Sequence, residues 1–164
     1  MKTTPADMWF SRCVRERAGW TCERCHKQYI PPTRALHCSH YIGRGNWAVR
    51  FEPLNAISLC YGCHQLMGSA RGSHAELYEK IFGKAAAEIV EEKAKDVALA
   101  KQYRRTKGIG EIAEHYKAEY ERMMALRAEG VTGRLEFVSY LRILFCFTMP
   151  LLILERVTKL FPNC

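Results

Sequence analysis

Four cysteines are arranged as two closely spaced pairs, which is the pattern of a metal site. Cys22 and Cys25 form one C-x2-C pair, and Cys60 and Cys63 form a second after an interval of 34 residues. Four thiolates supply the tetrahedral set of soft ligands that structural Zn²⁺ prefers, and each pair delivers two ligands from one tight turn. A thioredoxin-like redox site would need only one pair beside a β-α-β unit, which the sequence does not predict. We therefore expect a structural zinc site.

The remaining four cysteines have no partner at ligand spacing. The chain begins "MKTTPADMWF", which lacks the apolar core of a secretory signal, so we expect a reducing, cytoplasmic setting without disulfides. A free cysteine in such a setting behaves as a small hydrophobic residue. We predict packing roles for Cys13, Cys38, Cys146 and Cys164.

A histidine directly follows the second cysteine pair, at His64. Because four sulfurs already complete the zinc shell, His64 is free to belong to a second site. Upstream, His40 lies in the strand-like run "ALHCSHYI", and Asn55 opens a second short strand, "NAIS", before "YGCHQLM" begins a helix. The order His, Asn, His thus spans a strand–loop–strand–helix unit whose two ends the zinc would clamp.

A short helix is predicted before the first cysteine pair, over residues 4 to 18. Thr4 can cap it, Pro5 suits its first turn, Asp7 lies three residues after the cap, and Gly19 can end it. Together with the two strands this helix makes the first module, residues 1–72, an α+β unit.

The region from residue 73 to 140 is predicted to be mostly helical. Ser73 and Glu76 have the spacing of a capping box for a long helix running roughly to Arg105, which the glycine at position 83 could divide in two. The sequence "TKGIG" predicts a break, and a further helix is expected from Glu111 to Glu129. This region could contact DNA arms or dimerise.

The last segment, residues 141–164, is an apolar tail. Twelve residues from Ile143 to Leu154 carry no charge, which is short of the roughly 20 needed to span a bilayer, and Pro150 would kink them. We expect a buried packing or dimerisation segment, or an appended terminus, rather than a membrane anchor. A homodimer is therefore a candidate assembly, and no membrane partner is expected.

The positive charge of the chain is concentrated in the first module. The whole sequence has 25 Lys and Arg against 17 Asp and Glu, while residues 1–72 hold ten basic and four acidic side chains. A localised basic field is the expected footprint of a protein that binds a polyanion, most simply nucleic acid.

The residues around the second site resemble a known family. The stretch "CSHYIGRGNWAVRFEPLNAISLCYGCHQ" resembles the HNH (ββα-metal) nucleases with a four-cysteine zinc site, and most of all the phage NinG-type recombination nucleases. "FSRCVRERAGWTCERC" and "AEGVTGRLEFVSYL" are similar to other parts of that family, so the resemblance covers roughly residues 9 to 141. It implies a small zinc-clamped ββα module and a nuclease that cleaves branched or recombining DNA.

The resemblance also implies a role for each residue of the second site. His40 would be the general base that removes a proton from the attacking water, a task that suits an imidazole near neutral pH. His64 would ligate a catalytic Mg²⁺ or Mn²⁺ ion, and Asn55 would hold the loop by side-chain hydrogen bonds and so orient His40.

Four arginines are candidates for nucleic-acid contacts. Arg44 and Arg50 lie in the loop between the two strands, where a guanidinium group could clamp phosphate oxygens. Arg15 and Arg17 lie in the predicted first helix and would add to the basic face. Trp47, which lies in the loop with Arg44 and Arg50, could cap the hairpin or stack on a base.

One position departs from the family pattern. HNH enzymes commonly carry Asp or a second His just before the base as a further metal ligand, and this chain has Ser39 there. A hydroxyl is a weaker, neutral ligand, so Ser39 leaves the set incomplete. His37 could point to the same strand face and supply the missing ligand, and His74 is another candidate.

These patterns, together with the resemblance, favour a metal-dependent endonuclease that hydrolyses DNA phosphodiester bonds, and the resemblance implies a phage recombination context. The alternative is a catalytically inactive zinc-ribbon protein that binds DNA, for which Ser39 is the best support. Cleavage needs His40, whereas binding needs only the basic face and the four cysteines.

Overall fold

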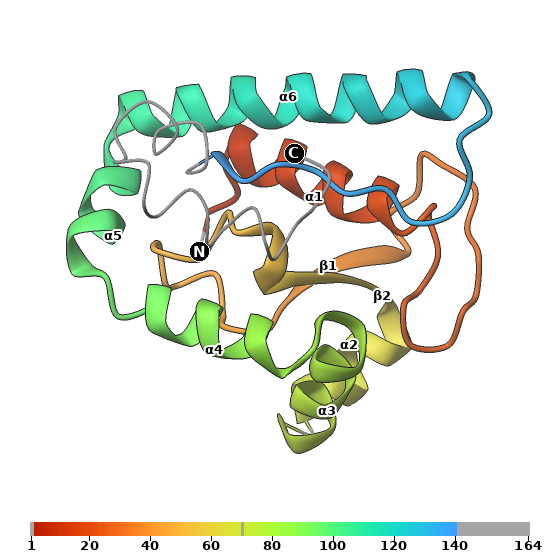
Figure 1. The fold of residues 1–164 in the computed structure, drawn as a ribbon, viewed down its shortest axis with the longest axis horizontal. Helices are drawn as coiled ribbons and strands as arrows, with labels where there is room; N and C mark the ends of the chain where they lie inside the picture. Colours follow the sequence, from red (N-terminus) through yellow and green to blue (C-terminus); the bar gives the residue numbers. More distant parts are fainter. Residues whose placement is uncertain (1, 70, 141–164) are drawn as a thin grey trace.

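The computed structural model describes residues 2–69 and 71–140, and these form an α+β fold with a small two-stranded antiparallel sheet (Figure 1). The elements follow the order α1 (Pro5–Arg17), β1 (Leu36–His40), the 3-10 helix η1 (Pro53–Asn55), β2 (Ala56–Cys60), α2 (Tyr61–Ser69), α3 (Arg71–Phe82), α4 (Lys84–Lys93), α5 (Val97–Arg104) and α6 (Thr106–Ala128). The α+β class expected from the sequence is confirmed.

Helix α1 begins with the predicted capping box. The backbone N–H and the hydroxyl of Thr4 each donate to Asp7 Oδ2 at 2.7 Å, and Asp7 N donates to Thr4 Oγ1 at 3.2 Å. Pro5 occupies the first turn, where its missing N–H costs nothing. The helix ends before Gly19, whose φ of +57° is a conformation that favours glycine.

The two strands form an antiparallel hairpin, and its register fixes where the candidate site residues of β1 lie. Leu36 pairs with Cys60 at one end, and His40 pairs with Ala56 at the other. Because side chains alternate along a strand, His37 and Ser39 share one face of β1. A long loop, residues 41–52, and then η1 connect the strands.

Helix α6 lies alongside α1, so the helical region and the first module share one hydrophobic core (Figure 1). Phe10 of α1 makes edge-on ring contacts with Phe51 of the loop and with Tyr116 of α6, at centroid distances of 6.0 and 5.1 Å. The chain after α6 then runs back along α1, and Leu135 N donates to Arg17 O at 3.1 Å.

The helical region divides differently from the prediction. The expected long helix is three helices, α3 to α5, and the first break does fall at Gly83, with a φ of +84°. The predicted capping box is wrong, because α3 already begins at Arg71 and Ser73 lies inside it. The "TKGIG" sequence lies inside α6, and the true boundary is Arg105, whose extended backbone ends α5.

Within residues 2–69 and 71–140, no helix is long and apolar enough to cross a membrane. The predictions made for the apolar tail, including Cys146 and Cys164, lie outside the residues that the structure describes.

Candidate functional site

The four paired cysteines come together in a cluster that could hold a metal ion. One ligand atom from each of Cys22, Cys25, Cys60 and Cys63 lies within 4.8 Å of all the others. The first pair lies in the turn after α1, and the second joins the end of β2 to the first turn of α2. Four sulfurs at this separation match the ligand set of structural zinc.

The thiols of this cluster affect one another's protonation. Burial would raise the pKa of Cys60, but hydrogen bonds from the Cys63 backbone and from neighbouring thiols lower it to about 7. Burial raises the pKa of Cys63 to about 12. The Arg24 guanidinium, whose Nη1 lies 3.5 Å from the sulfur, opposes this shift. Metal binding to these thiols would therefore release protons and depend on pH.

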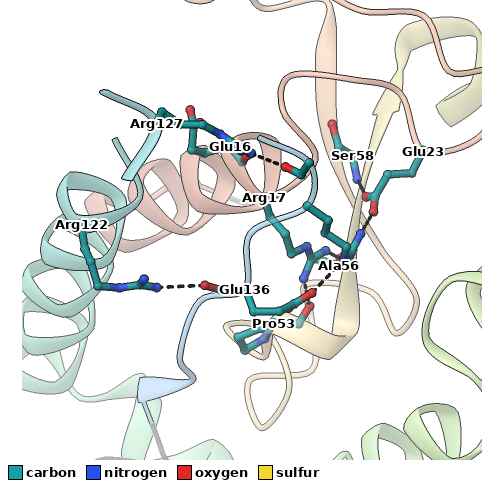
Figure 2. A network of polar contacts seen from close by, with 11 residues as sticks. Glu16, Arg17, Glu23, Pro53, Ala56, Ser58, Arg122, Arg127 and Glu136 are labelled. Carbon is teal, nitrogen blue, oxygen red and sulfur yellow. Dashed lines mark hydrogen bonds and ion pairs between the residues drawn. The ribbon is translucent and has the colours of Figure 1, made fainter. Parts of the chain in front are cut away.

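The first cysteine turn is also attached to the sheet by hydrogen bonds. Glu23 N donates to Ser58 O at 2.8 Å, and Ser58 N donates to Glu23 Oε2 at 2.6 Å. Figure 2 shows the second of these bonds between the turn and β2. These two bonds fix the backbone of the first cysteine turn relative to β2, the strand that ends at Cys60.

Two histidines, one from β1 and one from α2, meet in the same unit. His37 Nδ1 of β1 and His64 Nδ1 of α2 are 3.1 Å apart, with ring centroids 5.0 Å apart. Two nitrogens in neighbouring positions of an octahedral ion, each at about 2.1 Å from it, would lie roughly 3 Å from each other, so this spacing suits two ligands of one ion. Burial lowers the pKa of His64, and the charges of His37, His74 and Arg44 lower it further, which favours the neutral imidazole that binds metals.

Ser39 and His74 form a second pair on this face. Ser39 Oγ lies 3.4 Å from His74 Nε2, which α3 carries over the strand. Burial lowers the pKa of His74. Within the described residues the four cysteines are the only group of three or more metal-binding side chains with ligand atoms so close together, so His74 does not join the His37–His64 pair in this geometry.

His40 is held by one backbone carbonyl. Its Nε2 lies 3.0 Å from Arg50 O, and because a carbonyl oxygen only accepts, the neutral ring must carry its proton on Nε2. The lone pair is then on Nδ1, whose neighbour is Cys38 Sγ at 4.0 Å. Burial lowers the pKa of His40 to about 4, although the Arg50 carbonyl opposes that shift. At neutral pH the ring is therefore an uncharged acceptor.

Asn55 makes the loop hydrogen bonds that the sequence analysis expects. Its Oδ1 accepts from Ile42 N at 2.8 Å, and its Nδ2 donates to Ile42 O at 2.9 Å and to Val49 O at 2.8 Å. The side chain is fully buried, so these bonds fix both ends of the loop that follows His40.

Of the four candidate arginines, Arg44 is the most accessible. It is exposed in the loop, and its charge contributes to lowering the pKa of both His40 and His64. It therefore lies within electrostatic reach of the predicted base and of the histidine pair. Arg15 is half-buried and donates to the carbonyls of Ser11, Thr33 and Leu36.

Arg17 and Arg50 lie in the interior, where no phosphate could reach them. Arg17 donates to Pro53 O at 2.9 Å and to Ala56 O (Figure 2), and burial lowers its pKa to about 10. Arg50 is 1% exposed and pairs with Asp7. Their assignment to nucleic-acid binding does not fit this placement, because both guanidinium groups are committed inside the fold.

Sequence reasoning missed Asp7 as a partner of this site. Asp7 reads locally as a helix-capping residue, and nothing in the sequence signals its ion pair with a residue 43 positions away.

The family models, the curated proteins and the solved structures contain no match to this chain.

Proposed function

We propose that the chain is a metal-dependent endonuclease of the HNH type, acting on DNA phosphodiester bonds. The observation that carries the proposal is the His37–His64 pair, in which Nδ1 of His37 on β1 lies 3.1 Å from Nδ1 of His64 on α2. Strand β1 also carries His40, whose Nδ1 bears the lone pair. A cluster that could hold structural zinc braces the same unit. The branched or recombining substrate, in a phage setting, rests on the sequence resemblance alone.

In this proposal His37 and His64 hold the divalent ion, and Ser39 is left to its contact with His74. A bound Mg²⁺ or Mn²⁺ would stabilise charge on the phosphate and on the leaving oxygen. His40 Nδ1 accepts a proton from the attacking water, and its Nε2–H stays on the Arg50 carbonyl. Arg44 is an exposed cation of the loop, and its charge lowers the pKa of both His40 and His64. It therefore contacts a phosphate oxygen in this proposal.

A zinc-ribbon protein that binds DNA without cutting it remains the second candidate. It is favoured by one observation, namely that the buried Ser39 stands where the resemblance leads one to expect a stronger ligand, with its hydroxyl beside His74. Such a protein would use the cysteine cluster and exposed basic side chains, and would not need His40.

The test is cleavage of linear duplex and four-way-junction DNA by zinc-loaded protein with Mg²⁺, Mn²⁺ or chelator. We expect cutting only with added metal, and a loss of about 100-fold or more in His37→Ala and His64→Ala, because each removes a ligand. The matched control is His26→Asn, which changes an exposed histidine whose φ of +59° asparagine tolerates. Equal cutting in chelator, or by both ligand variants, would contradict the proposal.

A further inference from the structure

Three consecutive backbone carbonyls of the loop, in residues 49–51, each accept a hydrogen bond from a side chain of another element. The donors are Asn55 Nδ2 to Val49 O at 2.8 Å, His40 Nε2 to Arg50 O at 3.0 Å, and the Tyr116 hydroxyl to Phe51 O. We call residues 49–51 the carbonyl segment. The partner of His40 is thus the middle carbonyl of three, and its position depends on what holds the segment on either side.

Helix α1 holds the carbonyl segment through the side chain of Arg50. Arg50 Nε donates to Asp7 Oδ1 at 2.8 Å, and Arg50 Nη2 donates to Asp7 Oδ2 at 2.6 Å. Asp7 is itself fixed by Thr4, and the Trp47 ring lies 4.3 Å from the guanidinium carbon. Two parallel bonds of this kind fix direction as well as distance, and both partners are buried.

Helix α6 holds the same segment from a second direction. Tyr116 is fully buried, and its hydroxyl donates to Phe51 O while accepting from Tyr140 N at 3.3 Å. Burial raises the pKa of Tyr116 well above its ordinary value, so the hydroxyl keeps its proton and remains a donor. The helical region therefore reaches the residue next to the carbonyl that His40 uses.

The carbonyl matters because it selects which ring nitrogen of His40 carries the proton. A histidine with Nε2–H on a fixed acceptor presents Nδ1 as its base, whereas a ring without that acceptor can change tautomer or rotate. We propose that Asp7 and Tyr116 are positioning residues for His40, acting through the carbonyl segment. The proposal deepens the nuclease function and rests on it for its kinetic consequence, but the geometry of His40 can be measured without any cleavage.

The experiment compares two variants that change the size of a side chain very little. Asp7→Asn removes the charge and one of the two acceptor oxygens that hold Arg50, and Tyr116→Phe removes the hydroxyl that donates to Phe51 O. Matched controls are Glu16→Gln, which breaks a buried ion pair of the same helix with Arg127, and Tyr103→Phe. Tyr103 is a buried tyrosine whose ring contacts Phe51 but whose hydroxyl, within the described residues, makes no hydrogen bond to residues 49–51. The first readout is the tautomer of His40, from ¹⁵N NMR of the imidazole in zinc-loaded protein.

We expect wild-type His40 to be the Nε2–H tautomer and both positioning variants to show a mixture, while the controls stay as wild type. In cleavage assays kcat should fall about 10- to 100-fold with KM changed less than about twofold, the size of effect seen when groups that orient a reacting side chain are removed. Retention of the wild-type tautomer in either variant would overturn the proposal for that residue.

Two other outcomes are also decisive. If the controls shift the tautomer as much as the variants do, the effect is general loosening of the core, and positioning is contradicted. If the wild type does not cut DNA but the tautomer still shifts only in Asp7→Asn and Tyr116→Phe, the nuclease proposal fails and the positioning of His40 stands. Tyr116→Phe removes a single oxygen, so it keeps the test valid if Asp7→Asn does not fold.

Discussion

His40 has an environment that fixes its charge as well as its direction. It packs against Phe10, with ring centroids 5.8 Å apart, and has one carbonyl partner at Nε2. Burial disfavours the imidazolium ion, which lowers the pKa of His40 from 6.5 to about 4. A neutral imidazole at physiological pH is the form that a general base requires.

The low pKa predicts how stability depends on pH. Between about pH 6.5 and 4 the unfolded chain binds a proton at His40 that the folded chain does not, so the free energy of unfolding must fall as pH decreases through this window. One proton gives a slope of at most about 1.4 kcal/mol per pH unit. His40→Gln should have a shallower slope than wild type in urea unfolding at pH 5 to 6.5.

The zinc-loaded state of both proteins is the control, because the cysteine cluster contributes equally to each. Identical slopes would mean that His40 is accessible and protonates in the folded chain as it does in the unfolded chain.

At this scale the sequence could predict which residue types do chemistry but not all of their neighbours. The spacing of Cys22, Cys25, Cys60 and Cys63 predicts the metal site, because each pair needs only its own turn to present two sulfurs to one ion. Arg17 and Arg44 look alike in the sequence, yet one is buried on backbone carbonyls and the other is exposed. That difference depends on α1 packing against β2, which no local pattern records.

Among the elements, β2 and α2 depend most on the cysteine cluster. Cys60 ends the strand and Cys63 lies in the first turn of the helix, so a metal there would fix the angle between them and hence the place of His64. A bound structural ion contributes directly to folding free energy.

We therefore predict that Cys60→Ala loses the zinc, about one ion per chain in wild type, and unfolds at lower urea concentration. Cys38→Ala, which changes a cysteine outside the cluster, should keep the zinc and lower the midpoint less than Cys60→Ala does. Zinc content measured after gel filtration and urea titration by circular dichroism give the two readouts. A zinc-replete Cys60→Ala protein would show that the cluster is not the metal site.

The short elements could be predicted from their ends, and the helical region could not. Thr4 and Asp7 mark the start of α1 because a capping box is a local feature. The glycines of "TKGIG" suggested a break, but Gly108 lies in α6 where a Cβ would come 3.2 Å from the Gln102 carbonyl. A glycine at this position allows α5 and α6 to approach each other closely, and a contact between two helices is not visible in the local sequence. The cap of α5, Asp96, accepts from Leu99 N at 2.9 Å and was also missed.

For the whole molecule, the shared core argues that residues 1–72 do not fold alone. Phe10 packs on Phe51 and on Tyr116. The charged group of Arg17 lies 5.0 Å from the ring centre of Phe82 and 5.4 Å from that of Phe137. Without residues 73–140 these apolar and cationic groups would be left without their partners.

We predict that a zinc-loaded fragment of residues 1–72 shows no cooperative thermal unfolding, whereas the full chain does. Calorimetry of the two proteins at equal concentration measures this directly. A fragment with a sharp transition near that of the full chain would mean that the first module is an independent domain, as the sequence-based division at residue 72 assumes.

The central claim is that His40 is the base of a metal-dependent nuclease, and one arm of the cleavage assay tests it most directly. Zinc-loaded wild type and His40→Ala are bound to labelled four-way-junction DNA without any added divalent ion, and Mn²⁺ is then added in excess to start a single turnover. We predict equal binding by both proteins and a cleavage rate at least about 100-fold lower for His40→Ala. Equal rates would remove His40 from the mechanism, and binding without cutting by either protein would establish the DNA-binding alternative.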